Sequence, residues 1–313
     1  IGSIRMGTTV ATNALLERKG TPTGLVITKG FKDVVDIGTQ DRPDIFDIKA
    51  SRPKPLYDDV VEIEERVIPA RKDCKMSKIG SNEVTASTGE KYVVRKAISE
   101  TDVREKLKSL LDKNIRSLAV ILCHGYAFHE HELLIERIAI ELGFDHIAVS
   151  HKVMPMVKMV PRGQTTVVDA YLTPTINEYV RNFRSGFANS EKLNEKILFM
   201  RSDGGLTPVE SFFGSRAVLS GPAGGVRGYA AATYERLEKK APCIGFDMGG
   251  TSTDVSRWAG QAEIVYEGRA ANVQLQVPQL DIQTVAAGGG SILSFRGGLL
   301  QVGPESASAF PGP

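Results

Sequence analysis

A strand, a helix and a second strand follow one another near the middle of this chain, at the spacing of a βαβ unit. Residues 117–123 form a short apolar run, residues 130–142 carry a helical pattern that ends at Gly143, and residues 147–150 form another short run. Strands joined in this way pair in parallel, with a right-handed crossover. The sequence therefore predicts an α/β architecture.

The segments on either side carry further signals of regular structure. An apolar run at residues 25–28 predicts a buried strand, and residues 12–18 predict a helix. Ser99 and Asp102 form a start that resembles a capping box, and apolar residues at helical spacing follow it. Residues 51–96 are charged and strand-like, which predicts a protruding β region.

Apolar periodicity lapses over residues 155–165 and gives way to Pro, Gly and Thr. We therefore expect a boundary there between a first region, residues 1–164, and a second region, residues 165–313. In the second region we expect a helix at residues 174–187 that starts at Pro174, a strand at 197–200, a turn at 203–205 and a helix at 223–237.

Charge and apolar runs exclude several classes of protein. The chain has 39 basic and 37 acidic residues, interspersed along its length, for a net charge of +2. This balance argues against a nucleic-acid partner or a membrane surface. No apolar stretch approaches the roughly 18 residues of a membrane-spanning helix, and no signal peptide opens the chain, so we expect a cytosolic protein. Cys74, Cys123 and Cys243 follow no metal-site spacing, and we expect them to be reduced.

An apolar run at residues 242–247 leads directly into a glycine turn that two aspartates bracket. The segment reads Asp247, Met248, Gly249, Gly250, Thr251, Ser252, Thr253, Asp254. Gly249 and Gly250 permit a tight turn whose backbone N–H groups are open to a phosphate. The hydroxyls of Thr251 and Thr253 would add neutral donors. The pattern predicts a hairpin that holds the phosphates of a nucleotide.

Asp247 and Asp254 are the candidate catalytic and metal-binding residues of this hairpin. Carboxylates beside bound phosphates are the hard oxygen ligands that a hydrated Mg²⁺ prefers. Asp254 is also a weaker candidate for orienting a nucleophile. The alternative is a plain glycine-rich hairpin with solvated aspartates. GxxxxGK[ST] is absent, and no GxGxxG lies at a strand-to-helix turn, so a Walker loop and a Rossmann fingerprint are excluded.

Two other glycine runs are candidate nucleotide contacts. Gly221, Gly224 and Gly225 stand beside a predicted helix start, where N–H groups can bind an anion. Close packing of the backbone is the competing interpretation. Residues 288–290, which are Gly288, Gly289 and Gly290, follow a strand-like run and weakly resemble the glycine turn that contacts adenosine in the actin-like ATPase superfamily. A turn without a ligand is nearly as good an interpretation.

Five polar residues are candidates for substrate binding. Arg5 could recognise a carboxylate or phosphate, and Thr8 and Thr9 lie close to it in sequence. Arg201 and Asp203 follow a predicted strand end, where α/β proteins form ligand crevices. A surface ion pair for Arg5 and a turn-stabilising role for Asp203 are the alternatives.

A segment rich in His and Glu, residues 124–132, invites a metal assignment. Its spacing is not that of HExxH, and we interpret it as a solvated helix start. The Glu-Glu-Arg run at residues 64–66 is interpreted as a charged strand face.

The glycine hairpin resembles the phosphate loops of the actin-like ATPase superfamily, which includes sugar kinases and the heat-shock seventy chaperones. The resemblance implies a ribonuclease H-like fold of two domains, with a nucleotide held between them by one hairpin from each. Only the second hairpin is present, and the first would lie upstream of Ile1. Ile1 is not an initiator methionine and Pro313 ends a Gly/Pro-rich run, so we interpret the chain as a fragment truncated at both ends.

A finer resemblance extends over essentially the whole chain. The sequence is similar to the hydantoinase A/oxoprolinase family in seven runs, at residues 5–20, 41–48, 56–67, 200–206, 220–226, 245–256 and 279–292. Seven long runs in the same order argue strongly against a chance similarity.

The resemblance implies ATP-dependent opening of the lactam 5-oxo-L-proline to L-glutamate in glutathione turnover. It implies ATP, Mg²⁺ and a monovalent cation such as K⁺ as cofactors. A downstream hydantoinase B-like region or subunit would complete the hydrolysis, and a homodimer is left open. The alternatives are the ATPase subunit of a hydantoinase or of an acetone- or acetophenone-type carboxylase, a nucleotide-sensing module, and an inactive nucleotide-binding fragment.

Overall fold

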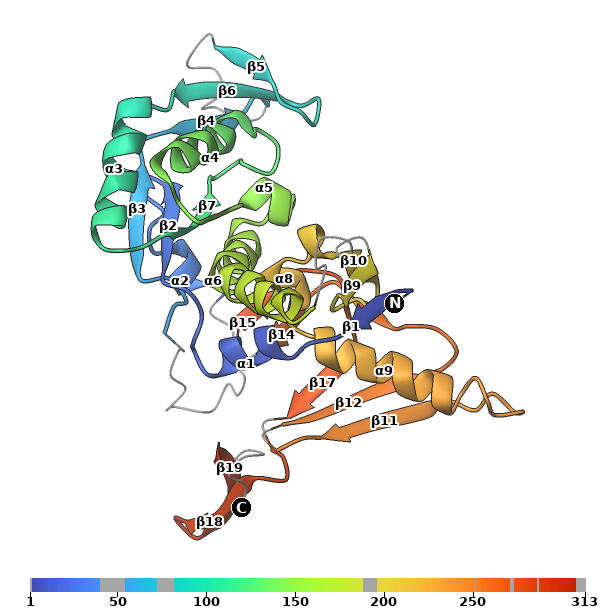
Figure 1. The fold of residues 1–313 in the computed structure, drawn as a ribbon. Coiled ribbons are helices and arrows are strands. Elements are labelled where there is room, and N and C mark those ends of the chain that lie inside the picture. The colour runs from blue at the N-terminus through green and yellow to red at the C-terminus, as the bar shows by residue number, and fades with distance from the viewer. Residues whose placement is uncertain are drawn as a thin grey trace.

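The structure is a computed structural model. It describes residues 2–39, 54–71, 82–187, 196–250, 252–270, 273–285 and 287–307. Figure 1 shows the two parts that matter for function, which are a helix-covered parallel sheet and a group of antiparallel strands beside helix α9.

A parallel sheet of four strands forms the larger part, in the order β3-β2-β7-β8. Its strands are β2 (Thr23–Thr28), β3 (Asp59–Ile63), β7 (Ser117–Ile121) and β8 (His146–Val149). All three neighbouring pairs are parallel, so the predicted βαβ unit is confirmed. Every residue of β2 and β7 is buried, as expected where helices cover both faces of a parallel sheet.

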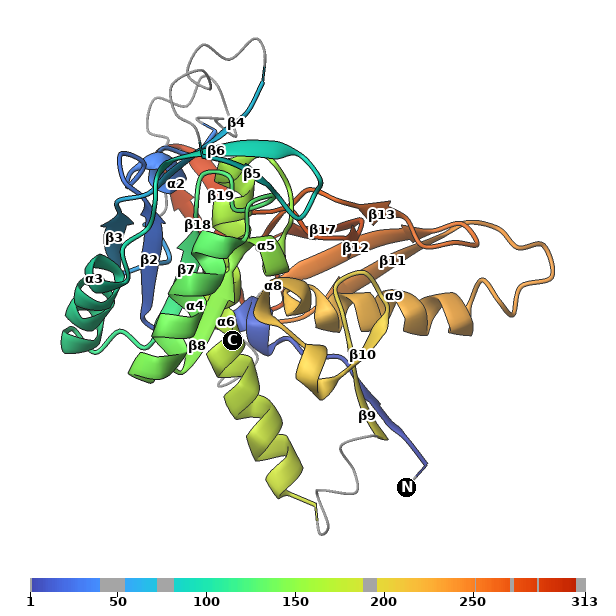
Figure 2. The same ribbon diagram turned by 90° about the horizontal axis from the view of Figure 1, so that it is seen from above.

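Helices α3 (Glu100–Asp112) and α4 (Glu130–Leu142) cover one face of this sheet, and α6 (Met159–Ser185) covers the other (Figure 2). Helix α1 (Val10–Leu16) packs on α6. The two-residue period of a strand divides the core accordingly. Val26 packs with the α3 and α4 side, whereas Leu25 and Ile27 pack with α1 and α6. The predicted start of α3 is confirmed, since the Ser99 hydroxyl accepts a hydrogen bond from the Asp102 N–H. The predicted end of α4 is confirmed as well, since Gly143 follows it in a left-handed conformation.

Helix α6 differs most from its prediction, because it begins at Met159 and carries Pro174 inside. Nearly every residue of its first half is buried, so no polar face marks a helical period in the sequence. Pro174 has no N–H to donate to the Ala170 carbonyl, and the Ser117 hydroxyl donates to that carbonyl instead, at 2.7 Å. Residue 165 lies within α6, so both expected regions pack on this helix, and the boundary at 165 stays a prediction.

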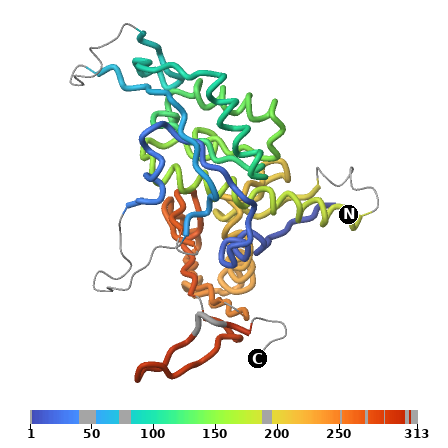
Figure 3. The backbone as a smooth tube through the Cα atoms, turned by 90° about the vertical axis from the view of Figure 1, so that its left-hand side faces the viewer, coloured from blue at the N-terminus to red at the C-terminus, as the bar shows by residue number. Residues whose placement is uncertain are grey.

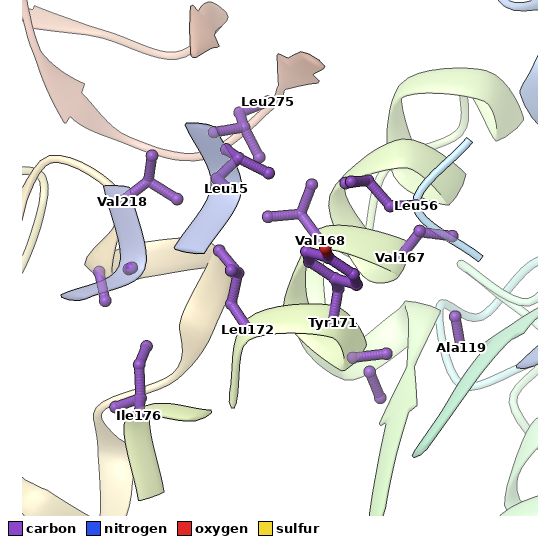
Figure 4. Close-up of a cluster of buried hydrophobic side chains, with 14 of the residues drawn as sticks. Leu15, Leu56, Ala119, Val167, Val168, Tyr171, Leu172, Ile176, Val218 and Leu275 are labelled. Atoms are coloured by element: carbon purple, nitrogen blue, oxygen red, sulfur yellow. The ribbon is translucent and has the colours of Figure 1, made fainter. Parts of the chain in front are cut away.

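The centre of the larger core lies around α6. Figure 4 shows Val168, Tyr171 and Leu172 on this helix, with Leu15 of α1 and Leu275 of the second half nearby. One continuous cluster therefore joins the parallel sheet to the residues that follow α6. Among the described residues, no helix is long and apolar enough to cross a membrane.

Three antiparallel strands form the projecting β region, in the order β4-β6-β5. They are β4 (Arg66–Pro69), β5 (Glu83–Thr85) and β6 (Lys91–Lys96), and they confirm part of the prediction for residues 51–96. The prediction is wrong for β3, which pairs in parallel with β2 and forms an edge of the main sheet. The side chains of β3 alternate too weakly in polarity to reveal that role.

The second half contributes a small mixed sheet and then α9. The sheet has the order β1-β9-β10 and consists of β1 (Ile4–Met6), β9 (Ile197–Met200) and β10 (Leu206–Pro208). Strand β9 is confirmed as predicted. Helix α9 (Ser220–Ala232) begins three residues earlier than expected and ends earlier too, because Pro222 is tolerated in a first turn, where no N–H is needed.

The predicted glycine hairpin is confirmed as strands β11 (Cys243–Met248) and β12 (Thr253–Trp258), which pair with β17 (Ile282–Val285) in an antiparallel sheet. Helix α9 lies along one face of this sheet. Strands β18 (Ser291–Arg296) and β19 (Leu299–Ser306) form a second hairpin that projects from the body (Figure 3).

The remaining elements are short. They are α2 (Val34–Ile37), α5 (Ser150–Val153), η3 (Val209–Ser211), α8 (Gly214–Ala217), β13 (Ile264–Val265), β14 (Gly268–Ala270), β15 (Val273–Leu275) and β16 (Gln279–Leu280).

Candidate active site

Asp247 and Asp254 lie directly opposite each other on β11 and β12. Opposed residues of an antiparallel pair point to the same face of the sheet, and here that face is the one toward α9. A Cβ atom built on Gly225 of α9 would lie 3.8 Å from Asp247 Oδ2. Asp254 Oδ1 accepts a hydrogen bond from the Thr284 hydroxyl at 2.6 Å. The hairpin therefore brings both predicted acids together.

The surroundings of Asp254 raise its pKa above the ordinary value of an aspartate. Burial is the larger cause and the neighbouring Asp247 is the second, while the Thr284 hydroxyl opposes both. Burial and the charge of Asp247 both disfavour the negatively charged form of Asp254. A cation placed between the two carboxylates would remove this penalty.

Two glycine turns are stacked at the tip of the hairpin. The Gly289 N–H donates to the Gly249 carbonyl and the Gly290 N–H to the Gly250 carbonyl, each at 2.8 Å. A Cβ atom at Gly288 would lie 2.6 Å from the Gly249 carbonyl oxygen, which no side chain could tolerate. Contact between the two turns therefore requires glycine.

This stacking uses several of the predicted phosphate donors. The Gly249 N–H donates to the Ser252 carbonyl at 2.9 Å and closes the turn. Thr253 is buried, and its hydroxyl donates to the Ala287 carbonyl at 2.6 Å. The Gly250 N–H has no acceptor among the residues that the structure describes. Thr251 lies outside the described residues.

The glycines at the start of α9 divide into different roles. A Cβ atom at Gly221 would lie 2.6 Å from Thr9 Cγ2, and the Thr8 N–H donates to the Ser220 hydroxyl at 3.2 Å. Gly221 thus allows close backbone packing, which is the competing interpretation. A Cβ atom at Gly224 would meet nothing within 4 Å, and only Gly225 faces the acid pair.

The five substrate candidates are spread over two places. Arg5 is exposed on β1 and Thr8 is buried, while Thr9 precedes α1 and touches the start of α9. Arg201 and Asp203 form an ion pair at 2.8 Å, and Asp203 also accepts a hydrogen bond from the Gly205 N–H. These contacts give Asp203 the turn-stabilising role, and among the described residues neither Arg201 nor Asp203 forms a hydrogen bond or ion pair with the acid pair.

A pocket of about 350 Å³ lies between α9 and the hairpin sheet, within the usual size range of small-molecule sites. Asp247 and Asp254 lie at one end. Tyr229 and Ser256 also line it, and their hydroxyls are 3.1 Å apart. The sequence reasoning missed these two residues. Helical spacing of four from Gly225 and strand spacing of two from Asp254 could have placed them beside the acids.

Two family models match the chain with little remaining. The hydantoinase/oxoprolinase N-terminal region matches residues 1–143, and the hydantoinase/oxoprolinase model matches residues 162–313. The chain belongs to the hydantoinase/oxoprolinase family. Three of the seven runs that carried the resemblance, at residues 220–226, 245–256 and 279–292, contribute to the acid pair and its pocket.

Curated members of the family include close relatives of this chain. The chain is 50% identical to the 5-oxoprolinase of Dictyostelium discoideum over 331 residues, which is 100% of this chain and 26% of that protein. It is 52% identical to 5-oxoprolinase 1 of Arabidopsis thaliana over 311 residues, which is 99% of this chain and 24% of that protein. The chain thus spans about a quarter of the length of these relatives.

A solved structure shares the fold of this family member. The ATP-dependent caprolactamase from Pseudomonas jessenii superposes with a TM-score of 0.72 at 26% identity, over 98% of this chain and 42% of that chain. The mixed α/β fold is therefore one that a cyclic amide hydrolase also uses.

The His- and Glu-rich segment of this family member is structural in its contacts. Glu132 is fully buried, and its carboxylate accepts hydrogen bonds from the Leu122 N–H, the Ser150 hydroxyl, and the N–H and ring of His151. His131 contacts Glu65 at 2.9 Å. The expectations of a solvated helix start and a charged strand face are wrong for these buried residues. Among the described residues, no group of three or more His, Cys, Asp or Glu could hold a metal.

Proposed function

We propose that this chain supplies ATP binding and amide activation to a cyclic amide hydrolase that opens 5-oxo-L-proline to L-glutamate. The observation that carries the proposal is the pair Asp247 and Asp254, which face each other beside two stacked glycine turns and line a pocket. Relatives that are about half identical in sequence bear the name 5-oxoprolinase. An ATP-dependent caprolactamase with the same fold acts on another lactam.

The chemistry explains why ATP is needed. A lactam carbonyl is a poor electrophile, because the amide is stabilised by resonance, and its nitrogen is a poor leaving group. In the proposed reaction the amide oxygen attacks the γ-phosphorus of ATP, and the bond to the bridging oxygen breaks as ADP takes the electron pair. Water then adds to the activated carbon, the carbon–nitrogen bond breaks, a proton goes to nitrogen and phosphate is released.

The residues of the hairpin would divide this work. Asp247 and Asp254 would hold Mg²⁺ or its water ligands, and the ion would supply charge neutralisation at the phosphates. Gly250 would donate its N–H to a phosphate oxygen, whereas Gly249, Gly288, Gly289 and Gly290 would provide a surface without side chains. K⁺ remains part of the proposal as the monovalent cation.

The rest of the reaction would need parts beyond these residues. A hydantoinase B-like region or subunit would complete the hydrolysis, and the lactam would be the small-molecule partner. The same proposal places the reaction in the cytosol and in glutathione metabolism. It also includes a homodimer as the form of the protein.

Coupled ATP hydrolysis by the longest natural polypeptide that contains these residues tests the proposal. We offer 5-oxo-L-proline, hydantoin and acetone in turn. ATP turnover should rise with 5-oxo-L-proline, and Asp247→Asn should lower that turnover roughly 100-fold. Stimulation by acetone and not by the lactam would favour the carboxylase alternative. Turnover that the Asn variant leaves unchanged would refute the assigned site.

A further inference from the structure

The pocket beside the acid pair has a layout that follows from the pleat of the hairpin. Three rungs of β11 and β12 point toward α9, because opposed residues share a face. The first rung is Asp247 with Asp254, the second is Gly245 with Ser256, and the third is Cys243 with Trp258. Successive rungs on one face are about 7 Å apart, since a strand rises about 3.3 Å per residue.

Helix α9 sets which rung is covered. Tyr229 lies over the second rung, where a Cβ atom at Gly245 would be 2.1 Å from its ring. One helical turn earlier, Gly225 has no side chain to place over the first rung. The ring of Tyr229 therefore forms a wall of the pocket, and the space beside the acids stays open.

The second rung offers a matched donor and acceptor. The hydroxyls of Tyr229 and Ser256 are hydrogen-bonded to each other, and either one could be the donor. One of the two hydroxyl hydrogens is used in the bond between them. The lone pairs that remain on the two oxygens can accept a hydrogen bond from a ligand N–H. Val226 and Ile282 supply apolar surface on the same pocket.

We infer that this pocket binds the cyclic amide, with the amide N–H at the hydroxyl pair of Tyr229 and Ser256 and the carbonyl directed toward Asp247 and Asp254. This inference rests on the proposed function and assigns its substrate site. In a lactam the carbonyl adjoins the nitrogen, so an N–H held at the second rung places the oxygen toward one of the two neighbouring rungs. The first rung is the one where the phosphates are proposed to bind.

Charge fixes the same orientation for 5-oxo-L-proline. Its carboxylate lies on the other side of the ring nitrogen from the carbonyl. Asp247 and Asp254 repel that carboxylate, and the third rung, around Cys243 and Thr233, carries no acidic residue among the pocket-lining residues. The arrangement with the carboxylate at the third rung separates like charges and presents the carbonyl to the nucleotide end.

Removing single oxygens from the pocket tests the inference. In the longest natural polypeptide that contains the chain, we measure binding of 5-oxo-L-proline by calorimetry with Mg·ADP present, and lactam-dependent ATP hydrolysis in parallel. Tyr229→Phe and Ser256→Ala should each weaken lactam binding about 3- to 10-fold, as expected for one lost hydrogen bond. The dissociation constant of Mg·ADP should stay unchanged. Tyr234→Phe, which removes a hydroxyl outside the pocket lining, is the matched control and should bind the lactam like wild type.

The N-methyl lactam supplies a second measurement that does not depend on a variant. It lacks the N–H, so wild type should bind it at least 10-fold more weakly than the parent lactam, and Tyr229→Phe should show a smaller difference between the two.

The outcomes separate the two proposals. Lactam binding without ATP turnover would contradict the proposed function and leave the pocket assignment standing. Lactam-dependent ATP turnover with wild-type lactam affinity in Tyr229→Phe and Ser256→Ala would overturn the pocket assignment, and the proposed function would stand.

Discussion

The parallel sheet β3-β2-β7-β8 is covered by helices on both faces, whereas within the described part of the chain the antiparallel sheet β11-β12-β17 is covered by a helix, α9, on one face only. Ile121 of β7 is fully buried, but Ile244 of β11 is 77% exposed and Phe246 is 66% exposed. The first sheet holds the fold together, and the second presents its α9-facing rungs to a pocket. In this chain, burial of both faces therefore distinguishes the sheet that supports the fold from the sheet that lines the pocket.

The acids of the two regions differ in the same way. Glu132 has four hydrogen-bond donors and no exposure to solvent. Within the described residues Asp254 has one hydrogen-bond donor, the Thr284 hydroxyl, and Asp247 is exposed. A carboxylate whose lone pairs are all used supports structure, and one with free lone pairs can bind a ligand. The number of donors, more than the residue type, separates the two roles.

The same substitution in each sheet gives the largest expected contrast. Ile121→Ala should lower the free energy of unfolding by about 4 kcal/mol, because it leaves a cavity between the sheet and α6. Ile244→Ala should change it by less than about 0.5 kcal/mol, since that side chain is mostly in water. Urea denaturation measures both. Equal losses would mean that the second sheet is covered in solution and that the comparison fails.

The apolar pattern was enough to predict most of the first sheet. Residues 117–123 form a continuous apolar run and residues 130–142 carry a helical period, and local pattern predicts such elements. Helix α6 could not be predicted from its start, because burial on all sides erases the period, and because Ser117 replaces the hydrogen bond that Pro174 cannot make. That compensation joins residues far apart in sequence.

An amide in place of Glu132 should have the next largest effect. Backbone N–H groups of Leu122 and His151 donate to different oxygens of this carboxylate, so the NH₂ of a glutamine must face a donor in either orientation. Glu132→Gln should cost about 3 kcal/mol of unfolding free energy. Glu136→Gln, one turn later on α4, removes only an exposed contact with Lys152 and should cost under about 1 kcal/mol. Similar values for the two variants would contradict the structural role of Glu132.

The candidate site was partly predictable for the same physical reason. Asp247, Gly249, Gly250 and Asp254 lie within eight residues, and a hairpin brings them together by local geometry alone. Local spacing places Tyr229 on the face of α9 that carries Gly225, and Ser256 on the face of β12 that carries Asp254. The two hydroxyls meet only because α9 packs on the sheet, and no local pattern predicts that packing. Likewise, the approach of Gly288 to Gly249 joins two turns that β12 and β17 separate in the sequence.

Asp254→Asn should produce a small change in stability of the opposite sign. The raised pKa of Asp254 means that the folded state prefers the protonated form, so the contribution of this group is favourable at low pH and is lost as the pH rises through the folded pKa. At pH 7 the asparagine variant should therefore be slightly more stable than wild type, by less than about 1 kcal/mol because water screens the pair. The difference should shrink toward pH 4 in thermal unfolding. A clear loss of stability at pH 7 would mean that Asp254 is structural.

The central claim is that Asp247 and Asp254 hold the metal ion of a bound nucleotide. Calorimetric binding of Mg·ATP to the longest natural polypeptide that contains the chain, and to its variants, tests this claim most directly. Asp247→Asn and Asp254→Asn should each weaken Mg·ATP binding at least 10-fold, because each removes a negative oxygen from the proposed ion site. Asp281→Asn, which changes an acid outside the pocket lining that contacts Gln283, should bind Mg·ATP like wild type. Equal Mg·ATP affinities in wild type and all three variants would contradict the account.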